Sequence, residues 1–251
     1  MRSILKNTLC LLFVALLASS YTQASTASVI TVGTWNIHKG KKLKQVMEEI
    51  EMTSLKDSDV LNLQEIMIKQ GQGEEVAKRF GYQFVSKGSN AIFTRFPIIA
   101  SGHVVVNPET GRSAVWADLS THRGTIVRVY CPHLSYKVKV SPFIPEIRGQ
   151  ETRRILEHAA DFNGSVIVAG DLNTVGFFVG GHEDEETIIL LKNAGYKDTL
   201  ERVATRTHQL VGRIDWIFAK GLQTLWAVKG EYTGSDHRWM QSMLTVQPAY
   251  H

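Results

Sequence analysis

The sequence predicts an α/β (α+β) protein in which mixed β-sheets are sandwiched between helices, and three observations predict it. Short runs of apolar and β-branched residues recur along the chain and alternate with polar segments, a pattern typical of strands. These runs outnumber the segments with helical periodicity. Several runs also follow one another with no helix between them, which favours mixed sheets over a parallel doubly wound sheet.

The predicted strands share a richness in Val, Ile and aromatic residues and are bounded by polar residues or glycine. In chain order they cover residues 30–35, 60–63, 91–93, 113–119, 125–130, 165–169 and 214–218. The chain shows no internal repeat, low-complexity tract or linker between them, so a single domain is expected.

Helices are predicted in residues 43–52, 74–80, 151–162 and 185–193. The last of them has an acidic first turn, residues 183–186, and Gly195 follows as a C-cap. Acidic side chains at a helix start interact favourably with the helix dipole. This acidic cluster is therefore interpreted as part of the helix and not as a metal site.

The first two dozen residues differ in character from the rest of the chain. Arg2 and Lys6 precede an apolar run at residues 9–18, and small residues such as Ala24 follow it. This order is typical of a secretory signal peptide, and the run is shorter than the roughly 20 residues that cross a bilayer as a helix. We therefore expect residues 1–24 to be a signal peptide and residues 25–251 to form the domain. The mature protein is expected to be secreted or periplasmic, with no stable membrane span.

Charge and cysteine content exclude several classes of protein. The formal charge of +4 falls to +2 without Arg2 and Lys6, and no block of the chain is strongly basic, so charge alone gives little support to nucleic-acid binding. Cys10 lies in the predicted signal peptide, which leaves only Cys131 and excludes an intramolecular disulfide. A lone strand cysteine is typical of a small buried side chain, and we prefer this interpretation to a thiol nucleophile. The chain also lacks a Gly-x-Ser-x-Gly elbow, a Walker loop and a His-Glu-x-x-His helix.

Acidic, amide and histidine side chains fall near the ends of the predicted strands. The apolar strand at residues 165–169 breaks at Gly170 and presents Asp171 and Asn173. In extended backbone these two side chains point the same way, and the alternative is a hydrogen-bonded Asx turn. The full set comprises Asn36, Glu65, His133, Asp171, Asn173, Asp215, Asp236 and His237.

Taken singly, most of these residues have structural explanations, such as a strand end at Glu65 or a helix cap at Asp236. Asp215 is different because Ile214, Trp216 and other apolar residues surround it. A carboxylate buried in such a setting needs a partner. His237 is the candidate partner.

In order and spacing, the blocks resemble the endonuclease/exonuclease/phosphatase superfamily. They include Thr-Trp-Asn-Ile-His at residues 34–38, Asn-Ala-Ile-Phe-Thr-Arg-Phe-Pro-Ile at 90–98, Arg-Gly-Gln at 148–150, Gly-Asp-Leu-Asn at 170–173 and Ser-Asp-His at 235–237. The resemblance extends from about residue 31 to about residue 246. It implies a four-layered sandwich, with two mixed sheets face to face, helices outside, and an active site at one edge.

The resemblance also implies a metal site. Glu65 would be the principal ligand of Mg²⁺ or Mn²⁺, with Asn36 beside it and Asp236 assisting. Carboxylate and amide oxygens suit these hard cations. Arg112 would contact a substrate phosphate.

The remaining residues would carry the chemistry of phosphoester hydrolysis. Asp171 would align or deprotonate the attacking water, and Asn173 would hold a phosphate oxygen. His133 and His237 would stabilise charge on the phosphoryl oxygens, and Asp215 would orient His237. A phosphodiester repels hydroxide, so its hydrolysis needs cationic groups on its oxygens together with an aligned nucleophile.

The expected function is that of an exported, metal-dependent phosphodiesterase, acting as a monomer, with nucleic acid the favoured substrate. His38 and the Ile66–Met67 pair depart from abasic endonucleases and disfavour that specificity. A lipid headgroup substrate, as in sphingomyelinases, is the first alternative, and the apolar segments 142–145 and 175–180 would serve it. A small-molecule phosphatase and a non-catalytic binding module are the others. Cations proposed for the rim of a nuclease site are Lys137, Lys139, Arg148, Arg153 and Arg154.

Overall fold

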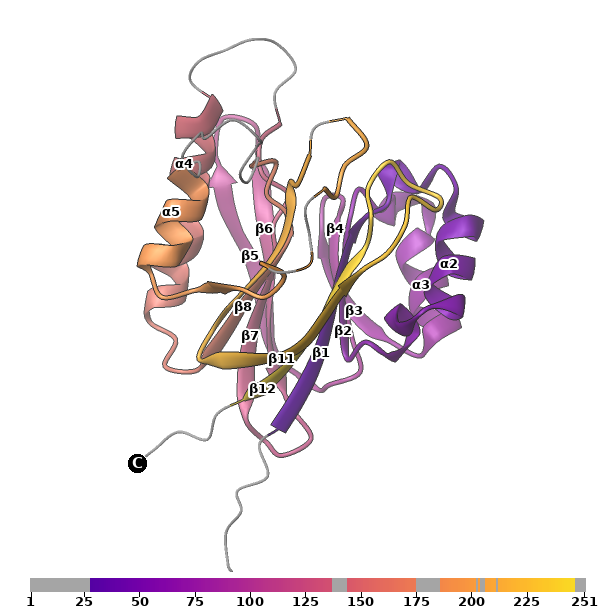
Figure 1. Cartoon of the computed structure of the whole chain (residues 1–251), viewed down its shortest axis with the longest axis horizontal. Helices are drawn as coiled ribbons and strands as arrows, with labels where there is room; N and C mark the ends of the chain where they lie inside the picture. The colour runs from indigo at the N-terminus through magenta and orange to yellow at the C-terminus, as the bar shows by residue number, and fades with distance from the viewer. Residues whose placement is uncertain are drawn as a thin grey trace, which may run out of the picture. The chain divides into compact units, whose positions relative to one another are not determined.

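Two mixed sheets of six strands face each other in the computed structural model, which describes residues 28–136, 144–174, 186–201, 203, 206–210 and 212–246 (Figure 1). This arrangement confirms the predicted fold class. The predicted signal peptide, residues 1–24, lies outside the described residues. No helix in the described part of the chain is long and apolar enough to span a membrane.

The first sheet contains, in order across it, β11 (Leu222–Lys229), β12 (Met240–Val246), β1 (Ser28–Asn36), β2 (Val60–Gln64), β4 (Asn90–Thr94) and β3 (Gln83–Lys87). The β1–β2 pair is parallel, and the other neighbouring strands are antiparallel. The crossover between β1 and β2 contains α2 (Leu43–Met52) and the 3₁₀ turns η1 (His38–Gly40) and η2 (Ser54–Asp57). A further turn, η3 (Ile68–Gln70), and α3 (Gln72–Phe80) follow β2.

The second sheet repeats this plan. Its order is β5 (Ile98–Asn107), β6 (Arg112–Ser120), β7 (Ile126–Cys131), β8 (Ser165–Asp171), β10 (Asp215–Lys220) and β9 (Lys197–Asp198). Only β7 and β8 are parallel among these described pairs. Their crossover contains α4 (Ile144–Ala160), and α5 (Glu186–Asn193) precedes β9. Each sheet therefore has one parallel pair. The crossover that joins the two strands of each pair contains a helix, which is the usual connection between parallel strands.

Three apolar clusters fill the spaces between the layers. The inter-sheet cluster includes Ile30 and Val60 from the first sheet and Val129 and Ile167 from the second. Another cluster, containing Trp35, lies under α2 and α3, and a third lies under α4 and α5. Figure 1 shows these helix pairs on the outer faces of the two sheets. The four-layered sandwich follows from burial of both faces of each sheet.

One buried polar side chain links the two sheets behind the site. Asn62 of β2 donates to the main-chain oxygens of Tyr130 (3.0 Å) and Ala169 (2.8 Å). These acceptors lie in β7 and β8, the parallel pair of the opposite sheet. The bonds hold the two parallel pairs in one relative register.

Some predicted boundaries were wrong. The helix predicted at residues 151–162 begins earlier, at Ile144, and takes Pro145 into its first turn, where a missing N–H does no harm. The strand predicted at residues 91–93 extends by one residue at each end, and Pro97 lies between this strand, β4, and β5. The helix predicted at 43–52 has those bounds in the structure.

Candidate active site

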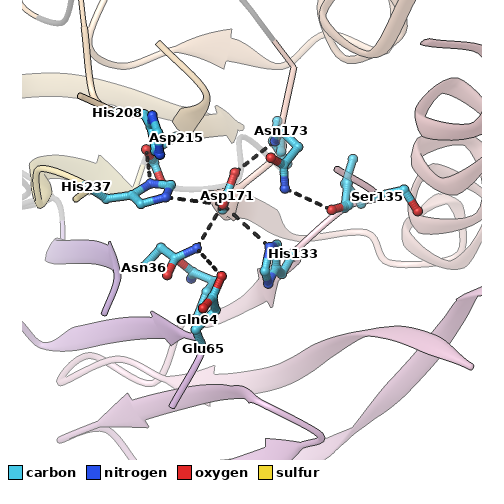
Figure 2. Close-up of polar contacts among 12 residues, drawn as sticks. Asn36, Gln64, Glu65, His133, Ser135, Asp171, Asn173, His208, Asp215 and His237 are labelled. Atoms are coloured by element: carbon cyan, nitrogen blue, oxygen red, sulfur yellow. Dashed lines mark hydrogen bonds and ion pairs between the residues drawn. The ribbon is translucent and has the colours of Figure 1, made fainter. Parts of the chain in front are cut away.

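The carboxyl ends of the two parallel strand pairs bring four of the predicted residues together. Asn36 ends β1 and Glu65 directly follows β2, whereas Asp171 ends β8 and His133 follows β7. Figure 2 shows these side chains facing one another from the two sheets. The sandwich therefore assembles residues that are more than 130 positions apart in the sequence.

Asp171 lies at the centre of the group. Its Oδ2 accepts a hydrogen bond from Asn36 Nδ2 at 2.9 Å. The Nε2 atoms of His133 and His237 are 3.5 Å and 3.9 Å from the same oxygen (Figure 2). The Asp171 side chain is 2% exposed, so these groups largely replace water around its carboxylate.

The turn after β8 is built by local chemistry. Asn173 donates its main-chain N–H to Asp171 Oδ1 at 2.9 Å, so the alternative Asx turn is present and the extended geometry predicted for this pair is wrong. The Asn173 amide donates to Leu134 O at 3.0 Å. A Cβ at Gly170 would lie 2.2 Å from Pro132 O, so only glycine allows this close approach to the strand end that carries His133.

Asp215 and His237 form a buried pair, which confirms the predicted partner of Asp215. Asp215 begins β10 opposite Asp171 in the antiparallel register. Its Oδ2 lies 2.9 Å from His237 Nδ1. Thr207 Oγ1 accepts the main-chain N–H groups of Ile214 (3.0 Å) and Asp215 (3.1 Å) and so fixes the strand start.

The charges around His237 favour its imidazolium form. Burial alone would lower the pKa of this imidazole, but neighbouring carboxylates, Asp215 first among them, outweigh burial and raise the pKa of His237 to about 10. At neutral pH the ring therefore presents a cationic Nε2–H toward Asp171. This is the group that a developing negative charge needs.

Asp236 faces two other histidines. Its Oδ1 is 2.7 Å from His38 Nδ1, and its Oδ2 is 3.6 Å from His208 Nε2. Burial alone would raise the pKa of Asp236, but the contacts with His208 and His38 outweigh it and hold the pKa well below its usual range. The His208 ring also packs edge-on against His237, with ring centroids 4.7 Å apart.

The backbone is strained where it meets the site. Among the described residues, the non-glycine residues with left-handed φ values are His38 (48°), Lys39 (58°), Glu65 (57°) and Asn173 (49°). All of them line one cleft, of about 1110 Å³. Left-handed backbone in such residues costs roughly 1 kcal/mol or more each, and such strain tends to gather at functional sites.

Cationic side chains surround the cleft. Arg112 donates to the main-chain oxygens of His133 (2.9 Å) and Leu134 (3.2 Å), which fixes its guanidinium in the wall. Lys39, Lys87 and Arg148 also line the cleft.

Of the cations proposed from the sequence for the rim of the site, some line the cleft and others do not. Arg148 lines the cleft, but Arg153 pairs with Glu186 and Arg154 donates to Val106 O at 3.3 Å, both away from the lining. Lys137 and Lys139 lie outside the described residues, as do residues 142–143 and 175–180 of the apolar segments.

The donor set fits a hard divalent cation. Glu65 presents a partly exposed carboxylate to the cleft, and Asn36 Nδ2 bridges it (3.3 Å) to Asp171. Two groups of acidic and histidine side chains have potential ligand atoms within 4.8 Å of one another: Asp171, Asp215 and His237, and His208, Asp236 and His237. The Asn36 oxygen itself accepts from His38 N at 3.0 Å.

Sequence reasoning missed His208, Lys39 and Lys87. His208 lies in a segment without apolar periodicity. An isolated β-bridge pairs it with His237, later in the chain, and brings it to the site. Lys39 follows the Asn36 block, but a lysine in a loop carries no signal of its own. Only the spatial arrangement identifies these residues.

Comparisons with known proteins agree with this geometry. A model of the Endonuclease/Exonuclease/phosphatase family matches residues 33–237. No curated protein sequence matches the chain. The structure of the human Nocturnin catalytic domain with bound sulfate anion is similar, with a TM-score of 0.70 at 18% identity over 87% of this chain and 95% of that one.

Two further solved structures share the fold. A Bacteroides thetaiotaomicron mannosyl-6-phosphatase has a TM-score of 0.67 at 17% identity over 86% of this chain and 99% of that one. The D. rerio TDP2 structure with a single-strand DNA product has a TM-score of 0.67, 17% identity and the same coverage. Because the family model spans most of the sequence, the chain belongs to the endonuclease/exonuclease/phosphatase family of phosphoester hydrolases.

Proposed function

We propose that the chain is an exported, Mg²⁺-dependent phosphodiesterase that cleaves nucleic acid by attack of water on phosphorus. The observation that carries the proposal is the setting of Asp171. This buried carboxylate lies beside two imidazoles and an amide, at the base of a cleft with a cationic wall. Such a carboxylate suits a general base that works against a negatively charged substrate.

Asp171 aligns the attacking water and takes its proton. As the water oxygen bonds to phosphorus, the bond from phosphorus to the leaving oxygen breaks, and that oxygen departs with the bonding pair and is protonated by solvent. Asn36 and Asn173 hold the carboxylate through hydrogen bonds of 2.9 Å to each of its oxygens. A fixed base places the water with little loss of entropy in the transition state.

His237 and His133 stabilise the charge that develops on the phosphoryl oxygens. Asp215 keeps His237 cationic and aims its Nε2 into the site. Asn173 contributes a further amide at the same edge. Fixed donors of this kind usually supply the largest part of rate acceleration.

Glu65, with Asn36 beside it, would hold the divalent cation. A divalent cation held by these residues would supply polarisation of a phosphoryl oxygen and neutralisation of its charge. The hard oxygen of Glu65 favours Mg²⁺ or Mn²⁺ over softer metals.

The cations of the cleft support a substrate with more than one phosphate. Lys39, Lys87, Arg112 and Arg148 line the cleft around a single catalytic group. Phosphates that flank the scissile one would meet the exposed Lys39 and Lys87 and the half-buried Arg112, whereas Arg148 is buried. Contacts of this type with the phosphate backbone dominate nucleic-acid affinity.

A substrate panel tests the proposal. Plasmid DNA, RNA, sphingomyelin and a bis-aryl phosphodiester are each assayed with Mg²⁺ and with chelator. We expect cleavage of DNA or RNA that stops with chelator and falls by at least about 10²-fold in Asp171→Asn. Asp161→Asn, an exposed change outside the cleft, serves as the matched control. Cleavage that survives chelation, or a preference for sphingomyelin, contradicts the proposal.

A further inference from the structure

The carboxylate of Asp236 is held by histidines on both sides. Among the described residues, Oδ1 is in contact with His38 Nδ1 at 2.7 Å and with Ser235 Oγ at 3.4 Å, and Oδ2 is 3.6 Å from His208 Nε2. The short contact is the one with His38.

The partners of the two rings determine which nitrogens carry hydrogen. Lys41 Nζ lies 2.6 Å from His38 Nε2, and an ammonium can only donate, so Nε2 accepts and Nδ1 carries the hydrogen. Leu210 N–H donates to His208 Nδ1 at 3.1 Å, so in the neutral ring the hydrogen is on Nε2. Each ring therefore presents an N–H, and not a lone pair, to Asp236.

This arrangement opposes metal binding by the His208, Asp236 and His237 group. A ligating histidine must offer a lone pair, which His208 Nε2 lacks while Leu210 N–H occupies Nδ1. A cation next to Asp236 would also face the His38 N–H. Glu65, in contrast, accepts a hydrogen bond from the Asn36 amide at 3.3 Å and lines the cleft.

We propose that His38 withdraws Asp236 from metal coordination, so that the chain binds one divalent cation, at Glu65. The inference rests on the proposed function, because it concerns the cation of that same site. An aspartate in place of His38 would set two carboxylates side by side and would create a second cation site.

Binding of Mn²⁺ to the whole folded chain tests the inference directly, with free Mn²⁺ followed by electron paramagnetic resonance. We expect one Mn²⁺ per native chain, binding weakened at least about tenfold in Glu65→Gln, and a change below about threefold in Asp236→Asn. His38→Asp should gain a second Mn²⁺, a result that misfolding does not mimic. His103→Asp, on an exposed position of β5 outside the cleft lining, is the matched control and should gain none.

Each other outcome counts against the inference. Two Mn²⁺ in the native chain, a loss in Asp236→Asn equal to that in Glu65→Gln, or no gain in His38→Asp would overturn it and leave the proposed function standing. No binding by the native chain would overturn both.

Discussion

Replacement of Asp215 by asparagine separates the charge of the buried pair from its geometry. The amide oxygen can still accept from His237 Nδ1, so the ring keeps its orientation, but the carboxylate charge is lost. The pKa of His237 should then fall from about 10 toward its ordinary value of 6.5. If it falls the whole way, the cationic fraction at pH 8 drops from nearly all to roughly 3%, so kcat/KM at pH 8 should fall about 30-fold.

The pH dependence is the diagnostic part of this prediction. At pH 6 most of the His237 rings of Asp215→Asn are again cationic, so kcat/KM should lie within about twofold of the native value. The assay is kcat/KM from pH 5.5 to 9 at saturating Mg²⁺, with a nitrogen-detected NMR titration of the ring. An equal loss at pH 6 and pH 8, or a ring pKa that stays above about 9, would refute the reasoning.

The raised pKa of His237 also makes the stability of the fold depend on pH. Because the folded-state pKa of His237 is raised, its contribution to stability is complete below about 6.5 and is lost as the pH rises through about 10. The free energy of unfolding of the native chain should decline across that window. In Asp215→Asn the decline should be smaller, as urea titrations at pH 6, 8 and 10 would measure.

Three other predictions concern substrate, stability and reactivity. Lys87→Ala should reduce the magnitude of the slope of log affinity for single-stranded DNA against log salt concentration by about one. An unchanged slope would show that Lys87 makes no phosphate contact. Arg213→Ala breaks a paired 2.7 Å bridge to the buried Asp198 and should cost about 3–5 kcal/mol in urea unfolding, whereas Arg79→Ala at the surface should cost under about 1 kcal/mol. Cys131 is fully buried and burial raises its pKa to about 12, so an alkylating reagent at pH 8 should label it only in urea; rapid labelling of the native chain would contradict this.

Much of the fold was predictable because the central strands carry strong signals. β8 is buried along its whole length, and its apolar run and the break at Gly170 are visible in the sequence. The strands that went unpredicted include the edge strands β3, β5, β9 and β11. Edge strands are partly exposed, as in β11, where residues 223–226 are all exposed, so their apolar pattern is weak. β12 was not predicted either, although it is a central strand.

Only part of the candidate site was predictable from the sequence. Asn36, Glu65 and Asp171 lie at strand ends, where the order of motifs identifies them. The contact of His38 with Asp236 was not predictable, because it joins two loops 198 positions apart through backbone conformations that no local pattern encodes. The cations at Lys39 and Lys87 were missed for the same reason.

The left-handed residues of the cleft set a limit on how this protein can be stabilised. Glycine would adopt the backbone angles of Lys39 or Glu65 without steric penalty. A search for thermostable variants, scored on folding alone, would therefore favour glycine at the very positions that line the cleft. Selection for activity has to oppose such glycine substitutions. A descendant of this protein that no longer needs catalytic activity should therefore lose these side chains early and keep the four-layered fold.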